Sequence, residues 1–215
     1  MPKIEGDYGE DYPLDAYFAN NGHTVLNSSI VFCFSSLKDL FDGKMEIYYF
    51  KNVTLSGHNG NRVAIRVPDY VEKLVGIPVK KYIVGDMDGG FARTVYVAQF
   101  PENFPVRAGL TVHDTQGSWS SYPAHSFEAG SLLSPARLPE FDEMFVYFTD
   151  PPGGWGIQTF STTKIAMPFR DRDICHIPLS SHPVVAGPGY RLAYVWCYWG
   201  KDMKSMEKFG EHGRI

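Results

Sequence analysis

Short apolar segments bounded by glycine and proline turns constrain the fold of this chain more than any other feature. Turn sequences such as PPGGWG and GPG separate runs of strand length, and the chain holds 21 glycines and 15 prolines. The charged, alanine-rich stretches of a helical bundle are missing. This pattern predicts an all-β protein, an antiparallel barrel or sandwich. The second half gives the clearest strands: Glu143–Thr149, Ile157–Thr162, Ile174–Leu179 and Tyr190–Tyr198.

The first half contains further strand-like runs and two short helical candidates. The segment SSLKDLFDG predicts one helical turn, with Ser35 or Ser36 as the N-cap and Gly43 at its end. A second short helix is expected over Asp69–Leu74. Residues 1–24 are expected to form an extended arm or a first edge element. The predicted strands are Ser28–Phe34, Met45–Phe50, Arg62–Val67, Val79–Val84, Arg93–Phe100 and Arg107–Val112.

Charge and cysteine content exclude several classes of protein. The net charge of -4 includes no basic stripe, so we expect no nucleic-acid partner. No apolar run approaches the roughly 20 residues of a membrane span, and no signal sequence is recognised, so we expect no membrane partner. The cysteines form no C-x-x-C pair, which excludes a zinc ribbon, and we expect buried reduced thiols in a cytoplasmic protein: Cys33, Cys175 and Cys197.

Two histidines and one glutamate stand in unusual local settings. His125 follows a proline-containing turn, His182 lies between an apolar strand and a Gly-Pro turn, and Glu143 opens an apolar strand. A carboxylate there is costly to bury unless a positive group meets it, and a metal ion held inside a barrel would supply that charge. The alternatives are hydrogen-bonded structural histidines and a glutamate at the rim. The tryptophans are interpreted as core or barrel lining: Trp119, Trp155, Trp196 and Trp199.

Four ordered motifs resemble the cupin-type uronate isomerases. This family includes 5-deoxy-glucuronate isomerase of inositol catabolism, the nearer match, and 5-keto-4-deoxyuronate isomerase of pectin catabolism. The resemblance covers residues 79–200, and Gln158 matches a family glutamine. The motifs are Gly85–Phe100, Gly117–Glu128, Asp142–Gly156 and Ser181–Tyr190.

The resemblance implies an all-β cupin fold, a jelly-roll β-barrel. Because the N-terminal part is weakly similar and short, it implies a bicupin whose first half is reduced. The expected divisions are a divergent half over residues 1–95, a barrel with the site over 96–200, and a polar tail over 201–215.

The resemblance also implies a divalent metal site. His125, Glu143 and His182 match family ligands, but the second histidine of the family's H-x-H falls on Phe127. We therefore expect Zn, Mn, Fe or Ni at a site that is weakened or has lost its metal. A family arginine falls on Phe148, and this change is expected to make the pocket more apolar.

The activity implied is metal-dependent aldose–ketose isomerisation of a sugar-acid-like substrate through an enediolate. Glu128 is a candidate base, and Tyr147 and Gln158 are expected to line the pocket. Arg170 and Arg172 either bind a sugar carboxylate or form a solvated turn.

Two alternatives stay open at this point. A diverged cupin enzyme could act as a dehydratase or an epimerase. A non-catalytic member could bind a sugar or serve as an assembly subunit, and the resemblance implies a homo-oligomer.

Overall fold

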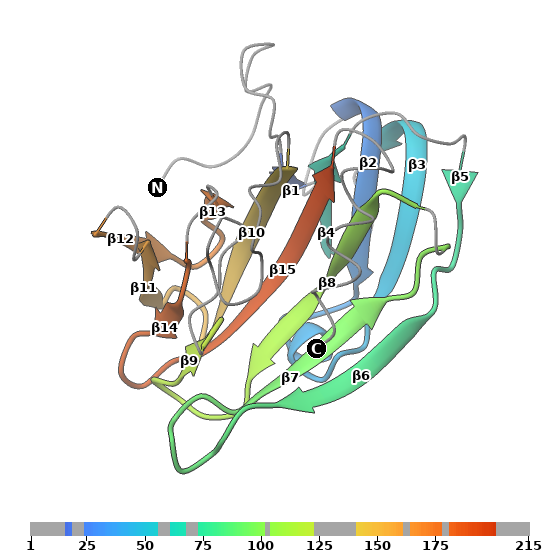
Figure 1. The fold of residues 1–215 in the computed structure, drawn as a ribbon. Helices are drawn as coiled ribbons and strands as arrows, with labels where there is room; N and C mark the ends of the chain where they lie inside the picture. Colours follow the sequence, from blue (N-terminus) through green and yellow to red (C-terminus); the bar gives the residue numbers. More distant parts are fainter. Residues whose placement is uncertain are drawn as a thin grey trace.

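The structure is a computed structural model with three antiparallel sheets and one short helix (Figure 1). It describes residues 16–18, 24–55, 61–67, 73–101, 104–122, 141–160, 164–177 and 181–200. Within these ranges, no helix has the length and apolar character needed to cross a bilayer. The tail at 201–215 lies outside them, as do His125, Phe127 and Glu128. The all-β prediction is confirmed.

The N-terminal sheet has five strands, and its central strand β2 carries the longest apolar run of the first half. The one helix among the described residues, α1 (Leu37–Phe41), follows β2. Ser36 is its N-cap as predicted, since Ser36 Oγ accepts from the Asp39 amide at 3.1 Å. Gly43 follows with a φ of +72°, a value that suits glycine. The strand order is β1 (Ala16–Phe18), β4 (Asn61–Arg66), β2 (Thr24–Phe34), β3 (Glu46–Leu55) and β5 (Lys73–Leu74).

The second and third sheets face each other and form the C-terminal part of the described chain. The six-stranded sheet has the order β13 (Ile174–Ile177), β10 (Phe141–Asp150), β15 (Arg191–Gly200), β8 (Val106–His113), β7 (Arg93–Ala98) and β6 (Val79–Val84). The four-stranded sheet has the order β12 (Ile165–Arg170), β11 (Trp155–Phe160), β14 (Val184–Ala186) and β9 (Trp119–Ser120). The sequence boundary between residues 95 and 96 falls inside β7, which pairs with both β6 and β8.

The six-stranded sheet is the middle layer, and both of its faces are buried over most of β10, β15 and β8, whereas its edge strand β6 is largely exposed. Along β10, Met144, Val146 and Phe148 join the core that includes the N-terminal sheet. Phe145 and Tyr147 alternate with them and join a second core with residues of the four-stranded sheet. Figure 1 shows β2, β3 and β4 on one side of β10 and β15, and β9, β11 and β14 on the other. We call the space between the six-stranded and four-stranded sheets the cup.

One sequence expectation about local structure, the second short helix, is wrong. Lys73 and Leu74, the end of the expected helix over Asp69–Leu74, form strand β5 against β3, and residues 69–72 lie outside the described ranges. Here pairing with β3 prevails over the local sequence signal.

The tryptophan interpretation holds only in part. Trp196 and Trp199 are buried, but Trp119 and Trp155 are 38% and 42% exposed, because both lie on the outer face of the four-stranded sheet.

Candidate functional site

The floor of the cup is built from rows of side chains that cross the six-stranded sheet. Residues opposite one another on neighbouring antiparallel strands project from the same face, so the strand register defines each row. The first row is Glu143 on β10, Tyr198 on β15 and Arg107 on β8; the second is Phe145, Trp196 and Gly109; the third is Tyr147, Tyr194 and Thr111.

Glu143 and His182 meet at one end of this floor. His182 Nε2 lies 3.7 Å from Glu143 Oε2, and their side chains are only 1% and 6% exposed. The His182 ring also packs edge-on against Phe145, with 5.7 Å between ring centroids. Glu143 Oε2 has no hydrogen-bond partner within the described part of the chain. Burial raises the pKa of the Glu143 carboxyl to about 8, so the carboxyl keeps its proton at neutral pH unless a cation binds.

Gln158 and Tyr147 hold the segment that carries His182. Gln158 Nε2 donates to the His182 carbonyl oxygen at 2.8 Å and to the Pro183 carbonyl oxygen at 3.1 Å. The Tyr147 hydroxyl donates to Gln158 Oε1 at 2.8 Å. Both side chains are fully buried. The geometry therefore gives these two residues a positioning arrangement behind His182.

The chemistry of this pair suits a divalent cation. A carboxylate and an imidazole are donors that Zn, Mn, Fe and Ni all accept, and an unsatisfied buried carboxyl oxygen is costly without a positive partner. No group of three or more His, Cys, Asp or Glu side chains converges among the residues that the structure describes. The other sequence-predicted residues, His125 and Glu128, lie outside those residues.

A second buried polar group, His113, is not among the residues that the sequence predicts for the site. It lies at the end of β8, six residues beyond Arg107, and its Nδ1 is 3.2 Å from Ser118 Oγ. Ser118 Oγ donates to the Thr115 carbonyl oxygen at 2.8 Å, so it accepts from His113 Nδ1, and Nε2 is left as an acceptor with no partner in the described structure. Burial lowers the pKa of His113 to about 3. In the sequence, the alternating residues Arg, Gly, Thr and His at positions 107, 109, 111 and 113 indicate that one face of this strand is more polar than the other, and this pattern could have drawn attention to His113.

Phe148 is not part of the cup. It faces the N-terminal sheet, where its ring packs edge-on against Phe34 at 5.6 Å. The expectation that Phe148 makes the pocket more apolar is therefore wrong, because strand alternation turns it away from Tyr147.

Arg170 and Arg172 lie near an exposed turn between β12 and β13. Arg170 is exposed, and Arg172 Nε lies 3.9 Å from Asp171 Oδ2. Of the two interpretations of these arginines, the structure supports the solvated turn.

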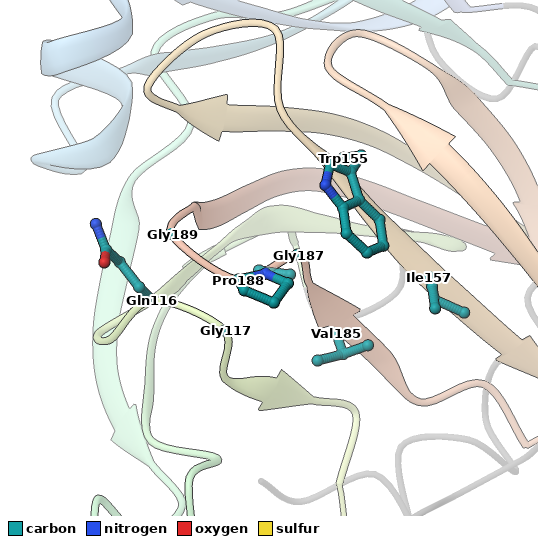
Figure 2. A pocket seen from close by; sticks show the side chains of 9 residues that line it. Gln116, Gly117, Trp155, Ile157, Val185, Gly187, Pro188 and Gly189 are labelled. Carbon is teal, nitrogen blue, oxygen red and sulfur yellow. The ribbon is translucent and has the colours of Figure 1, made fainter.

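A separate pocket of about 490 Å³ lies outside the cup, on the outer face of the four-stranded sheet (Figure 2). Trp155, Ile157 and Val185 line it together with the Gly187–Gly189 turn. Along β11, Ile157 faces this pocket while its neighbour Gln158 faces the cup, so the same strand serves both sides.

Comparison with known proteins points to one family. The KduI/IolB family matches residues 91–213. Proteins described as 5-deoxy-glucuronate isomerase from Geobacillus thermodenitrificans (strain NG80-2) and Geobacillus kaustophilus (strain HTA426) are each 30% identical over 101 residues. That stretch is 44% of this chain and 36% of each relative, so the match spans about a third of the relatives' length.

A solved structure supports the fold over a longer stretch. An IolB-like protein from Salmonella typhimurium LT2 superimposes with a TM-score of 0.64 at 15% identity, covering 87% of this chain and 83% of that one. At this identity the likeness shows the fold alone, and it confirms the cupin-type β-barrel expectation.

Proposed function

Because the chain belongs to the KduI/IolB family, we propose that it is an aldose–ketose isomerase acting on a uronate-like or deoxy-sugar substrate. The curated relatives that match it are described as 5-deoxy-glucuronate isomerase, which names the first substrate class to test. The observation that carries the proposal is the buried Glu143–His182 pair in the cup, with an unsatisfied carboxyl oxygen 3.7 Å from the imidazole.

Glu143 and His182 are the described residues that would hold a divalent ion. His125 is the third ligand that the sequence predicts, and Phe127 would leave the site one imidazole short of the family pattern. When bound, such an ion supplies Lewis-acid polarisation of a carbonyl or hydroxyl oxygen.

The chain's own residues would orient the sugar and move one proton. Isomerisation transfers a proton between adjacent carbons, which needs a side chain that accepts it and returns it. We propose Glu128 for this role, on sequence grounds. Gln158 and Tyr147 would act as positioning residues, since their hydrogen bonds fix the His182 backbone at the edge of the cup.

A non-catalytic, sugar-binding cupin is the second candidate function. It is favoured by one observation: only two candidate ligands meet in the described part of the cup. A homo-oligomer, implied by the family resemblance, is a separate proposal that light scattering tests.

The deciding experiment follows 5-deoxy-glucuronate by NMR in deuterated water, with Mn²⁺, Zn²⁺, Fe²⁺ or Ni²⁺ added in turn. We expect the aldehyde signal to give way to a ketone signal, with solvent deuterium at the carbon that receives the proton. Glu143→Ala and His182→Ala should abolish conversion, and Glu46→Ala is the control because Glu46 is exposed on the N-terminal sheet.

Metal content and turnover of the same samples distinguish the candidate functions. Stoichiometric metal without turnover of 5-deoxy-glucuronate would favour another cupin chemistry. Sugar binding with neither metal nor turnover would favour the binding protein. Metal content and turnover unchanged by both alanine variants would show that the site is elsewhere.

A further inference from the structure

The first row of the cup floor places a positive charge two strands away from the candidate catalytic pair. Glu143 on β10 pairs with Tyr198 on β15, and Tyr198 pairs with Arg107 on β8. Neighbouring strands are about 4.8 Å apart, so the Arg107 and Glu143 backbones lie roughly 10 Å apart.

Strand alternation directs Arg107 to the cup rather than to the N-terminal sheet. Its neighbours Val106 and Ala108 are buried in the core that includes the N-terminal sheet, which places Arg107 on the opposite face of β8. Gly109, the next residue on the cup face, leaves room for the Trp196 ring, since a Cβ there would lie 2.5 Å from Trp196 Cζ2.

The Arg107 side chain is held in place at the start of β8. Its Nη1 donates to the Val106 carbonyl oxygen at 2.8 Å and to the Phe104 carbonyl oxygen. Burial raises the pKa of the Tyr198 phenol, and the positive charge of Arg107 opposes that rise. The Arg107 guanidinium therefore acts electrostatically on Tyr198, the middle residue of the row. An arginine fixed in this way loses little conformational entropy when it binds a ligand.

Exposure changes along the row. Glu143 is buried, whereas Tyr198 and Arg107 are half-buried. A ligand lying along the row would therefore have one end in the dry part of the cup and its other end near solvent.

We propose that Arg107 binds the carboxylate of the sugar-acid substrate, while the Glu143–His182 pair meets its carbonyl end. This inference rests on the proposed function and adds the residue that selects an acidic sugar over a neutral one. A uronate carries its carbonyl and its carboxylate at opposite ends of a six-carbon chain, so one molecule has a group for each end of the row. Arginine binds carboxylates through two parallel N–H donors, which gives direction as well as charge.

The test compares D-glucuronate with D-glucose, which carries a hydroxymethyl group where glucuronate has its carboxylate. Affinities of wild type and Arg107→Gln are measured by titration calorimetry. We expect Arg107→Gln to weaken glucuronate binding by about 10- to 100-fold, the range for a charge-assisted hydrogen bond, and to leave glucose binding unchanged. Arg107→Lys should retain part of the preference, because it keeps the charge and loses the paired donors.

Arg170→Gln is the matched control, since Arg170 is exposed on edge strand β12. A purely structural role for Arg107 would weaken both sugars equally or lower the unfolding temperature of Arg107→Lys as much as that of Arg107→Gln. Either result would overturn the inference.

The NMR isomerisation assay on the same variants separates this inference from the proposed function. If wild type isomerises the uronate and Arg107→Gln binds glucuronate as tightly as wild type, the role proposed for Arg107 is wrong and the proposed isomerase function is kept. If wild type neither converts 5-deoxy-glucuronate nor binds glucuronate, both proposals fall.

Discussion

The two ends of the cup floor each bury one polar atom that has no hydrogen-bond partner among the described residues. At one end it is Glu143 Oε2, and at the other it is His113 Nε2. Burial drives both groups toward their neutral forms, raising the pKa of Glu143 to about 8 and lowering that of His113 to about 3. The desolvation is therefore alike at both ends.

The two groups differ in the side chains that surround them. His113 is tied through Nδ1 to Ser118, and its ring packs edge-on against Tyr194 with 6.3 Å between centroids. Glu143 instead faces a second candidate metal ligand, His182, at 3.7 Å and shares a row with Arg107. Equal burial thus yields a structural histidine at one end and a candidate reactive pair at the other, because the neighbours differ.

The largest expected difference between the ends is in turnover. Glu143→Gln should lower kcat of the isomerisation by about 10²- to 10⁴-fold, the range for loss of a residue that takes part in the reaction. His113→Gln should keep kcat within a few fold, since its Nδ1 contact lies away from the candidate pair. Steady-state assays of both variants decide this, and an equal loss in both would remove the distinction.

Metal binding is the next largest effect. Adding Zn²⁺ to metal-free protein at 100 times its Kd should raise the free energy of unfolding by about 2.7 kcal/mol. His182→Ala should abolish this increase, whereas His113→Gln should retain it. Urea unfolding with and without Zn²⁺ provides the measurement. An increase that survives in His182→Ala would place the metal elsewhere.

The pH dependence of stability should have opposite signs at the two ends. Between pH 4.5 and 8 folded Glu143 binds more protons than the unfolded chain, so metal-free stability falls as pH rises through this window. Between pH 6.5 and 3 the unfolded chain binds more protons at His113, so stability falls as pH drops. Each slope is at most about 1.4 kcal/mol per pH unit.

Urea titrations distinguish Glu143 from His113 in the pH ranges where only one of the two changes the stability. Glu143→Gln should flatten the slope from pH 6.5 to 8, and His113→Gln the slope from pH 4.5 to 3. If Glu143→Gln leaves the slope between pH 6.5 and 8 unchanged, the Glu143 carboxyl is not protonated in the folded protein.

The smallest effect concerns two tyrosines in the third row. Tyr147→Phe removes the bond to Gln158, and Tyr194→Phe removes the 2.8 Å bond with Ser120, so each should cost about 1 kcal/mol of stability. Only Tyr147→Phe should also lower kcat, by a few fold, because Tyr147 donates to Gln158, which in turn donates to the His182 carbonyl oxygen, whereas Tyr194 bonds to Ser120. Parallel unfolding and kinetic measurements test the pair, and a matching kcat loss in Tyr194→Phe would contradict the positioning role.

Much of the strand pattern was predictable, and the exceptions have physical causes. The predicted strand Val79–Val84 agrees with β6, and Glu143–Thr149 lies within β10. β9 and β14 are too short to carry a periodic signal. β12 contains Pro168, which counts against a strand from sequence but is tolerated on an edge strand.

The candidate site was predictable in part. Glu143 and His182 were chosen from their unusual local settings and from the family resemblance, and the structure brings them together. The sequence does not indicate a role for Arg107 or His113. Each lies within or beside an apolar run, and the role of a polar residue there depends on the surface that faces it.

The amino-acid sequence by itself determined where most strands run and which side chains alternate along them, because alternation follows from local backbone geometry. Only the tertiary structure decided which of the two faces lines the cup. Tyr147 and Phe148 are equally buried neighbours, yet one faces the candidate site and the other the N-terminal sheet. Both faces of β10 are covered, so hydrophobicity cannot distinguish them. The choice rests on contacts between segments distant in the chain.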